Sequence, residues 1–134
     1  MGNDPRIVTA AVVIEDSRLL LARRAPHDTL AGYWELPGGK LERGETPQQC
    51  LARELREELA MSAEIGDILA ETVHEYAHGC FRMIALKTSR LSDFRLLVHD
   101  RVAWVAPDEL SDYELAPADV ALVSQLMAKG IWRQ

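Results

Sequence analysis

The sequence lacks the features of proteins that cross a membrane or coat a nucleic acid. Its 134 residues contain no apolar run of about 18 residues, the length that a helix needs to cross a bilayer. The opening segment MGNDPRIVTA has no basic stretch followed by an apolar one, so we expect no signal peptide. The net charge of −6 argues against a nucleic acid polymer as partner, because proteins usually bind the negatively charged phosphate backbone through a basic surface. We therefore expect a cytoplasmic protein without membrane contact.

Cysteine is scarce, and sequence repeats and low-complexity segments are missing. The two cysteines, Cys50 and Cys80, form no CxxC pair, and we expect both to be reduced thiols. No linker divides the chain, whose length suits one domain over residues 1–134. The sequence leaves both a monomer and a homodimer open.

Strand and helix patterns follow one another along this domain. From apolar and β-branched runs we predict strands over residues 7–15, 18–24, 34–36, 62–76, 81–88 and 101–105. We predict helices over 47–60 and 117–129 and a helical turn over 107–110. The Pro37–Gly38–Gly39 segment is predicted to be a turn. Strands mixed with two main helices indicate an α/β (α+β) domain in which helices cover a sheet.

The helix over residues 47–60 has strong local signals. Thr46 is a candidate N-cap, Pro47 fits the first helical position, and Gln49 completes a capping box. At about 100° per residue, three leucines fall on one stripe of this helix: Leu51, Leu55 and Leu59. Three carboxylates share the face beside that stripe: Glu54, Glu57 and Glu58. The helix therefore combines a core stripe with an acidic face.

The acidic face has two interpretations. One is a solvated surface, although like charges at these spacings repel each other. The other is a metal site, because Gly38 and Gly39 allow positive φ and would bring backbone carbonyls close to the helix. Mg²⁺ and similar hard cations take oxygen ligands from carboxylates and carbonyls.

The spacing of the charged residues resembles a known signature. From Gly39 to Met61 the sequence follows G-x5-E-x7-R-E-L-x-E-E-x-A-M. This resembles the box of the Nudix hydrolases, G-x5-E-x7-R-E-U-x-E-E-x-G-U, at every charged position. Ala60 replaces a glycine, and Met61 replaces the usual Ile, Leu or Val. The resemblance implies the Nudix fold, a mixed β-sheet sandwiched between α-helices, with its box at residues 39–61.

The resemblance also implies roles for the acidic residues of the box. Mg²⁺, or Mn²⁺ in its place, would be held mainly by Glu57 and Glu58 with the carbonyl of Gly38. Glu54 would be a further metal ligand or the base that takes a proton from the attacking water. Glu45 would bind the metal through water or brace the loop.

Two cations take supporting roles in the same resemblance. Arg53 would hold Glu54 by a charge-assisted hydrogen bond. Lys40 would neutralise charge on the diphosphate as its bond breaks. Such a site suits phosphoryl chemistry, which depends on positioning and charge neutralisation.

Two segments beyond the box resemble MutT-type enzymes, which act on nucleoside triphosphates: LLLARRAPHDTLAGYWELPGGKLERGET and YELAPADVALVSQLM. Arg23 sits where such enzymes have a phosphate-facing arginine, whereas we favour a solvent position for Arg24. Trp34 would either pack in the core or form a wall of the base pocket.

Asp119 is the candidate residue for reading the base. Leu115–Asp119 (LAPAD) is similar to the CTP pyrophosphohydrolase branch, whereas the 8-oxo-guanine branch typically has Asn at this place. A carboxylate can accept a hydrogen bond from the cytosine amine, and also from purine N–H groups. Alternatively, Asp119 is an acidic residue that the helix dipole favours in a first helical turn.

The resemblance predicts Mg²⁺-dependent hydrolysis of a nucleoside triphosphate, (d)CTP or a modified cytosine nucleotide, to a monophosphate and diphosphate, for nucleotide-pool sanitation. The alternatives are an 8-oxo-dGTP or broad (d)NTP diphosphatase, and a nucleotide-binding module without turnover.

The sequence departs from the MutT-type pattern at one further position. MutT-type enzymes often carry a Glu six residues before a late-strand tryptophan, and counted back from Trp104 this position is Val98. Either Asp100 substitutes for this Glu or the site lacks it.

Overall fold

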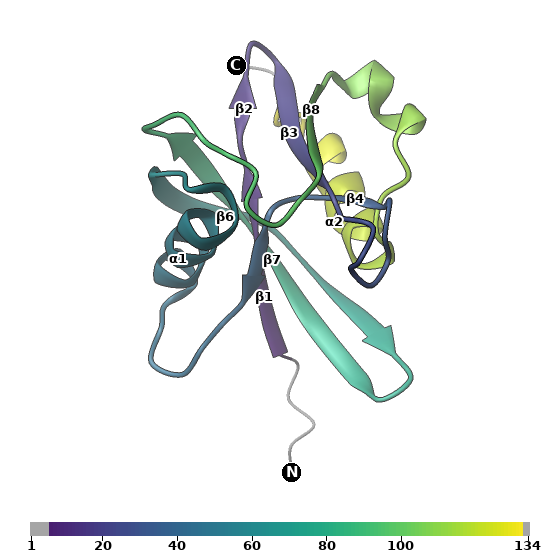
Figure 1. The fold of residues 1–134 in the computed structure, drawn as a ribbon. Coiled ribbons are helices and arrows are strands. Elements are labelled where there is room, and N and C mark those ends of the chain that lie inside the picture. Colours follow the sequence, from purple (N-terminus) through teal and green to yellow (C-terminus); the bar gives the residue numbers. More distant parts are fainter. Residues whose placement is uncertain (1–5, 133–134) are drawn as a thin grey trace.

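The part of the chain that the structure describes forms two β-sheets and two α-helices, shown in Figure 1. The computed structural model of the protein describes residues 6–132. The first five residues of the segment MGNDPRIVTA, for which we expect no signal peptide, lie outside the described residues. The elements are β1 (Arg6–Val12), β2 (Ile14–Glu15), β3 (Arg18–Arg23), β4 (Trp34–Glu35), β5 (Gly38–Lys40), α1 (Pro47–Leu59), β6 (Ala63–Tyr76), β7 (Gly79–Arg90), β8 (Arg101–Val105), the 3-10 helix η1 (Pro107–Asp112) and α2 (Pro117–Ala128). Within residues 6–132, no helix is long and apolar enough to cross a membrane.

The first sheet is mixed and has the strand order β5–β1–β7–β6. β1 runs parallel to β7 and antiparallel to β5, while β6 and β7 form an antiparallel hairpin. In the second sheet, which is antiparallel, β3 pairs with β8 along one edge and with β2 and β4 along the other. β1 is therefore an interior strand whose two partners come from distant parts of the chain.

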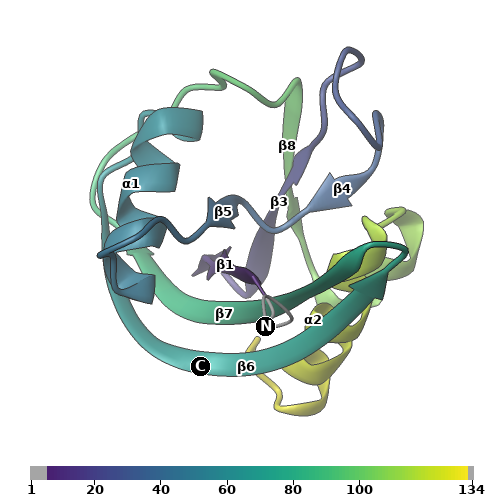
Figure 2. The same ribbon diagram turned by 90° about the horizontal axis from the view of Figure 1, so that it is seen from below.

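The first sheet lies between the two helices, as predicted. Successive side chains of a strand face opposite sides, so Ala10 packs into the core under α2 while Ala11 packs into the core under α1. The predicted leucine stripe of α1 is fully buried: Leu51, Leu55 and Leu59. Figure 2 shows α1 and α2 on opposite sides of the curved β6–β7 hairpin. The α+β class and the sandwich of a mixed sheet between helices are confirmed.

Helix α1 begins where its local signals predict. The side chain of Thr46 accepts the N–H of Gln49 at 3.1 Å, and the side chain of Gln49 accepts the N–H of Thr46 at 3.0 Å. At the other end, Ala60 caps the helix in the left-handed conformation, with φ 50° and ψ 35°. This conformation is costly for any residue with a Cβ. The Nudix box has glycine at this position because glycine adopts the left-handed conformation without this cost, whereas this protein has Ala60 there.

One strand prediction and one turn prediction were wrong. The run predicted as one strand over residues 7–15 is divided at Val13, because β1 belongs to the first sheet and β2 to the second. The predicted turn at Pro37–Gly38–Gly39 is instead the start of β5, which pairs with β1. A Cβ on Gly38 would lie 2.0 Å from the carbonyl oxygen of Thr9. Close packing of two strands therefore requires this glycine.

Candidate active site

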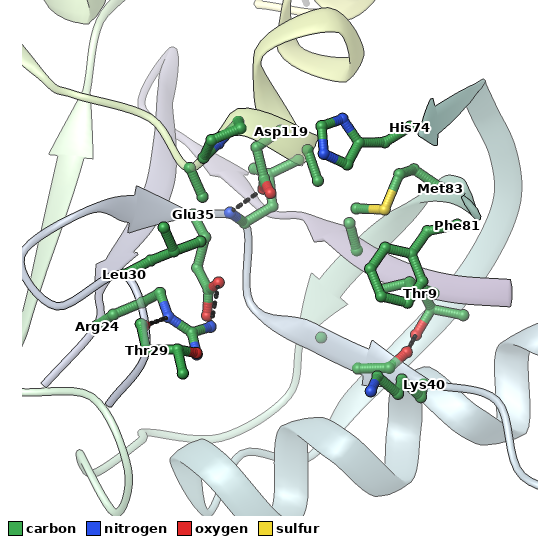
Figure 3. Close-up of a pocket in the computed structure, with 18 of the residues that line it drawn as sticks. Thr9, Arg24, Thr29, Leu30, Glu35, Lys40, His74, Phe81, Met83 and Asp119 are labelled. Carbon is green, nitrogen blue, oxygen red and sulfur yellow. Dashed lines mark hydrogen bonds and ion pairs between the residues drawn. The ribbon is translucent and has the colours of Figure 1, made fainter. Parts of the chain in front are cut away.

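A cavity of about 450 Å³ is lined by residues from both helices and both sheets. Its volume is typical of small-molecule sites. Met83 and Phe81 of β7 form an apolar wall, and Figure 3 shows Asp119 and Lys40 at different ends of the cavity. Glu58 of α1 and Asp119 of α2 both line it. The cavity therefore connects the acidic face of α1 with the start of α2.

Glu58 is the box carboxylate that lines this cavity. Its Oε1 is buried and has no hydrogen-bond partner among residues 6–132. Burial raises the pKa of Glu58 to about 7; the charge of His99 opposes this change, and the charges of Glu54 and Glu35 add to it. A buried carboxylate oxygen without a partner is costly. Ligation of a cation would remove that cost.

Glu54 is held against strand β5. A Cβ on Gly39 would lie 2.3 Å from the carboxyl carbon of Glu54, so only glycine permits this approach. The sequence suggested that Gly39 supplies a positive φ, but its φ is not positive. Burial raises the pKa of Glu54, although the hydrogen bond from Arg53 opposes the increase.

Arg53 connects three of the predicted carboxylates. Its Nε donates to Glu45 Oε2 at 2.6 Å. Its Nη1 donates to Glu54 Oε1 at 3.0 Å and to Glu57 Oε1 at 2.7 Å. The predicted contact between Arg53 and Glu54 is therefore present. Hydrogen bonds from Arg53 and from a backbone N–H lower the pKa of Glu45 to about 2. Glu45 thus braces the loop before α1 and anchors Arg53.

The donor set fits a hard cation, although it is not gathered around one point. Within residues 6–132, no three His, Cys, Asp or Glu side chains lie together as a metal-binding group. Arg53 explains this arrangement, because it holds Glu54 and Glu57 in ion pairs. Glu58 nevertheless offers a buried oxygen without a partner, and Gly38 lines the same cavity. Ligation by Glu54 and Glu57 would require their release from Arg53.

Asp119 lies in the first turn of α2 and faces the cavity. The residue is 5% exposed, and its Oδ2 accepts the N–H of Leu36 at 2.9 Å. Burial raises the pKa of Asp119 to about 7 against the opposing effect of that hydrogen bond. Asp119 thus lies in the first turn of α2, as the helix-dipole interpretation expects, and it is also buried beside the cavity.

Lys40 lines the cavity near the apolar wall. Its Nζ lies 5.6 Å from the centre of the Phe81 ring, and its side chain is exposed. The Phe81 ring stacks on Tyr76 at 4.9 Å between centroids. The Lys40 carbonyl accepts a hydrogen bond from Arg53 at 3.2 Å. Lys40 is therefore joined to Arg53 of the box through its backbone carbonyl, and the residue also lines the cavity.

Three interacting side chains beside the cavity escaped the sequence analysis: Arg24, Glu35 and His99. Arg24 Nη1 donates to Glu35 Oε1 at 3.0 Å, and His99 Nε2 lies 2.8 Å from Glu35 Oε2. Arg24 and Glu35 line the cavity, so the solvent position expected for Arg24 is wrong. Burial lowers the pKa of His99, but the hydrogen bond and charge of Glu35 and the charge of Glu58 outweigh it and raise the pKa.

The only local sign of this group was Glu35, a lone charge between Trp34 and Leu36 in a short apolar segment. His99 is separated from Glu35 by 64 positions, and no sequence period connects them. The contact between Glu35 and His99 can be recognised only in the folded structure, where β4 and the end of the 91–100 loop lie side by side.

Several other candidates lie outside the lining of the cavity. Arg23 donates two hydrogen bonds to Asp100, at 2.8 and 3.0 Å, and lies over the ring of Trp34. Trp34 packs edge-on against Tyr113 and against the core, which is the first of its two expected positions. Asp100 is thus paired with Arg23, and Val98 is 39% exposed. The described structure therefore gives no substitute carboxylate from Asp100.

Comparison with known proteins identifies the family. The sequence model of the NUDIX domain matches residues 5–131. The chain belongs to the Nudix hydrolase family. This Nudix hydrolase is 38% identical over 125 residues to the CTP pyrophosphohydrolase of Escherichia coli (strain K12), and the match covers 90% of each chain. It is 34% identical over 125 residues to the putative 8-oxo-dGTP diphosphatase 2 of Mycobacterium tuberculosis, covering 90% of this chain and 87% of that protein.

Solved structures agree on the fold of the Nudix hydrolase. The solution structure of the E. coli ORF135 protein superposes with a TM-score of 0.86 at 34% identity, covering 99% of this chain and 96% of that chain. The MutT NUDIX hydrolase from Burkholderia pseudomallei gives a TM-score of 0.81 at 27% identity, with 91% and 98% covered. The Nudix fold and the hydrolase class are therefore confirmed.

Proposed function

We propose that this Nudix hydrolase is a Mg²⁺-dependent pyrophosphohydrolase of cytosine nucleoside triphosphates that serves nucleotide-pool sanitation. Water and (d)CTP, or a modified form of it, would give the monophosphate and diphosphate. The observation that carries the proposal is a single cavity lined by Glu58 of the Nudix box and by the buried Asp119. A relative of 38% identity that is named CTP pyrophosphohydrolase supports the same substrate class.

The box residues would form the metal face. Mg²⁺, or Mn²⁺ in its place, would be held by the carbonyl of Gly38 and by carboxylates of the α1 face: Glu54, Glu57 and Glu58. A bound cation would neutralise phosphate charge and lower the pKa of an attacking water. Glu45 would contribute mainly by anchoring Arg53.

The side chains around this face would orient the substrate and move the proton. A Glu54 carboxylate released from Arg53 would be able to accept a proton from the attacking water. Lys40 would counter the charge of the departing diphosphate from the side of the cavity. Arg24 already reaches the cavity, whereas Arg23 would have to leave Asp100 to contact a phosphate.

Asp119 would select the base. Its Oδ2 is fixed by the N–H of Leu36, which orients the carboxylate towards the cavity. The cytosine N4 amine is a donor that such a carboxylate accepts. Trp34 would support the site from the core by packing beside β4.

The test is a nucleotide panel of CTP, dCTP, 5-methyl-dCTP, dGTP, 8-oxo-dGTP and ADP-ribose with Mg²⁺, with products resolved by chromatography. We expect monophosphate and diphosphate, fastest from a cytosine nucleotide and abolished by EDTA. Glu57→Gln should lower kcat by about 100-fold because it removes a metal ligand. Glu64→Gln, which removes an exposed carboxylate of β6, is the matched control.

Asp119→Asn tests the base assignment in the same panel. We expect kcat/KM for dCTP to fall by about 10-fold to 100-fold, the usual value of one base-reading contact. Glu114→Gln, an exposed acidic residue just before α2, should leave it unchanged.

The second candidate is an 8-oxo-dGTP diphosphatase, which the name of the M. tuberculosis relative favours. Rapid turnover of 8-oxo-dGTP alone would retain the metal face and reject the cytosine assignment. A thermal shift with nucleotide but no product from any member would instead indicate a binding module.

A further inference from the structure

His99 is a buried residue at the end of an otherwise open loop. The loop over residues 91–100 is mostly exposed, and its next-to-last residue, His99, is only 6% exposed. Its neighbour Val98 is 39% exposed, and its other neighbour Asp100 is paired with Arg23 outside the cavity. Burying an imidazole is costly unless it makes hydrogen bonds. The burial of His99 therefore requires an explanation in its contacts.

Among the described residues, this imidazole makes one side-chain hydrogen bond, to Glu35. Nε2 lies 2.8 Å from Glu35 Oε2, and an ionised carboxylate only accepts, so Nε2 carries the proton and donates. Nδ1 is buried and has no hydrogen-bond partner in the described structure. If His99 served only to fill space, an apolar side chain would do so without the cost of an unpaired buried nitrogen. The contact that defines His99 is thus the one to Glu35.

Glu35 needs external support to keep its orientation. Strand β4 has two residues, Trp34 and Glu35, and so fixes the backbone over a short distance. Both carboxylate oxygens of Glu35 are held by donors, Oε1 by Arg24 at 3.0 Å and Oε2 by His99. Figure 3 shows the Arg24–Glu35 pair at the edge of the cavity. The carboxylate is therefore clamped from two sides while it lines the cavity.

The clamped carboxylate lines the same cavity as Glu58 of the metal face and Asp119 of the base end. Its charge acts both on Glu58 of the metal face and on Asp119 of the base end. A substrate that reaches both Glu58 and Asp119 would occupy the cavity that Glu35 lines. A change in the orientation of Glu35 would therefore alter how tightly the substrate is held.

From these contacts we infer that His99 is a positioning residue, which holds the Glu35 carboxylate in the orientation that binds the nucleotide. It acts through Glu35 and contributes to substrate affinity, while the chemical step remains with the box. The inference rests on the proposed function, because it takes a nucleoside triphosphate as the occupant of the cavity.

The test compares two amides that differ by one methylene. His99→Gln places an amide nitrogen close to the position of Nε2 and can still donate to Glu35, whereas His99→Asn is too short to reach it. The probe is α,β-methylene-dCTP with Mg²⁺, measured by calorimetry. We expect His99→Asn to weaken binding by about tenfold, the loss of about one charge-assisted hydrogen bond. His99→Gln should stay within about threefold of the unmodified protein, and Val98→Ala should not change the affinity.

A double-mutant cycle shows whether the effect runs through Glu35. Glu35→Ala should weaken binding, and adding His99→Asn to it should cause no further loss. For turnover, His99→Asn should raise KM while kcat stays within about twofold. Equal losses in the Asn and Gln variants, additive losses in the cycle, or unchanged affinity in His99→Asn would each overturn the inference.

The binding measurement separates this inference from the proposed function. If the analogue binds with the expected pattern but the unmodified protein hydrolyses no triphosphate, the proposed reaction fails and the positioning role stands. If triphosphates are hydrolysed but the pattern of the His99 variants is absent, only the positioning role fails. If the analogue does not bind at all, both fail.

Discussion

Glutamates with the same chemistry behave very differently in this site. Glu58 is half-buried, its buried Oε1 has no partner among the described residues, and burial raises its pKa to about 7. Glu45, a few turns away along the chain, receives hydrogen bonds from Arg53 and has a pKa of about 2. The difference follows from surroundings, because desolvation disfavours the charged form and a hydrogen-bonded arginine favours it. The stability of the protein should therefore respond to pH in opposite ways at these two residues.

Glu58→Gln should stabilise the metal-free protein increasingly as pH rises. The folded pKa of Glu58 is about 7 and the reference value is 4.5, so the folded state holds an extra proton between these pH values. The stability that Glu58 contributes is present below pH 4.5 and is lost as pH rises through 7. We expect the pH-dependent advantage of the variant to reach about 1–3 kcal/mol above pH 7. Urea unfolding in EDTA at several pH values measures it.

Glu45→Gln provides the contrasting control. The folded pKa of Glu45 is lowered to about 2, so its stabilising effect is present above pH 4.5 and is lost as pH falls towards 2. If the free energies of unfolding of Glu58→Gln and the unmodified protein differ by the same amount across pH 4 to 8, the raised pKa of Glu58 is contradicted.

At the scale of elements, α1 depends on its two ends in different ways. The first end has a complete capping box at Thr46, whereas the last has Ala60 in the left-handed conformation. Ala60→Gly should stabilise the protein by about 0.5–1 kcal/mol, because the relief of the left-handed cost exceeds the added freedom of the unfolded chain. Thermal melting measures the gain. Gly44→Ala, at φ +85°, should have the opposite sign.

The contact between β5 and α1 is a second test at this scale. Gly39→Ala would place a methyl group 2.3 Å from the Glu54 carboxyl carbon, so Glu54 has to move. We expect kcat to fall by about 10-fold to 100-fold, as when the shell that orients a metal ligand is disturbed. Gly66→Ala, whose Cβ would meet Lys87 at an ordinary 3.6 Å, is the control. Full activity of Gly39→Ala would show that Glu54 needs no fixed position.

The elements also show what the sequence could predict. α1 was found because Thr46, Pro47 and the leucine stripe are local signals that act within the helix itself. β5 was missed because its two glycines read as a turn, and its strand character arises from pairing with β1 about 30 positions earlier. The division of residues 7–15 at Val13 likewise depends on which sheet each half joins. The carboxylate face was predictable from spacing, but the Glu35–His99 contact required the folded arrangement.

At the scale of the whole molecule, the cavity combines groups from both helices and both sheets. Mg²⁺ alone should change the melting temperature little, because Glu54 and Glu57 are already paired with Arg53. Mg²⁺ with α,β-methylene-dCTP at about 100 times its Kd should stabilise the fold by about 2.7 kcal/mol. Differential scanning fluorimetry compares the two conditions, and Glu57→Gln should reduce the combined shift. A large shift with Mg²⁺ alone would mean that the carboxylates leave Arg53 readily.

The interior position of β1 has a consequence for synthesis on the ribosome. β1 is synthesised before its parallel partner β7, which begins only at Gly79. Until then one edge of an apolar strand has no partner, and such edges pair readily with other chains. Parallel pairing between distant segments is also slow to form. The N-terminal half of this enzyme should therefore depend on chaperone protection during translation, and truncated chains that end before β7 should aggregate.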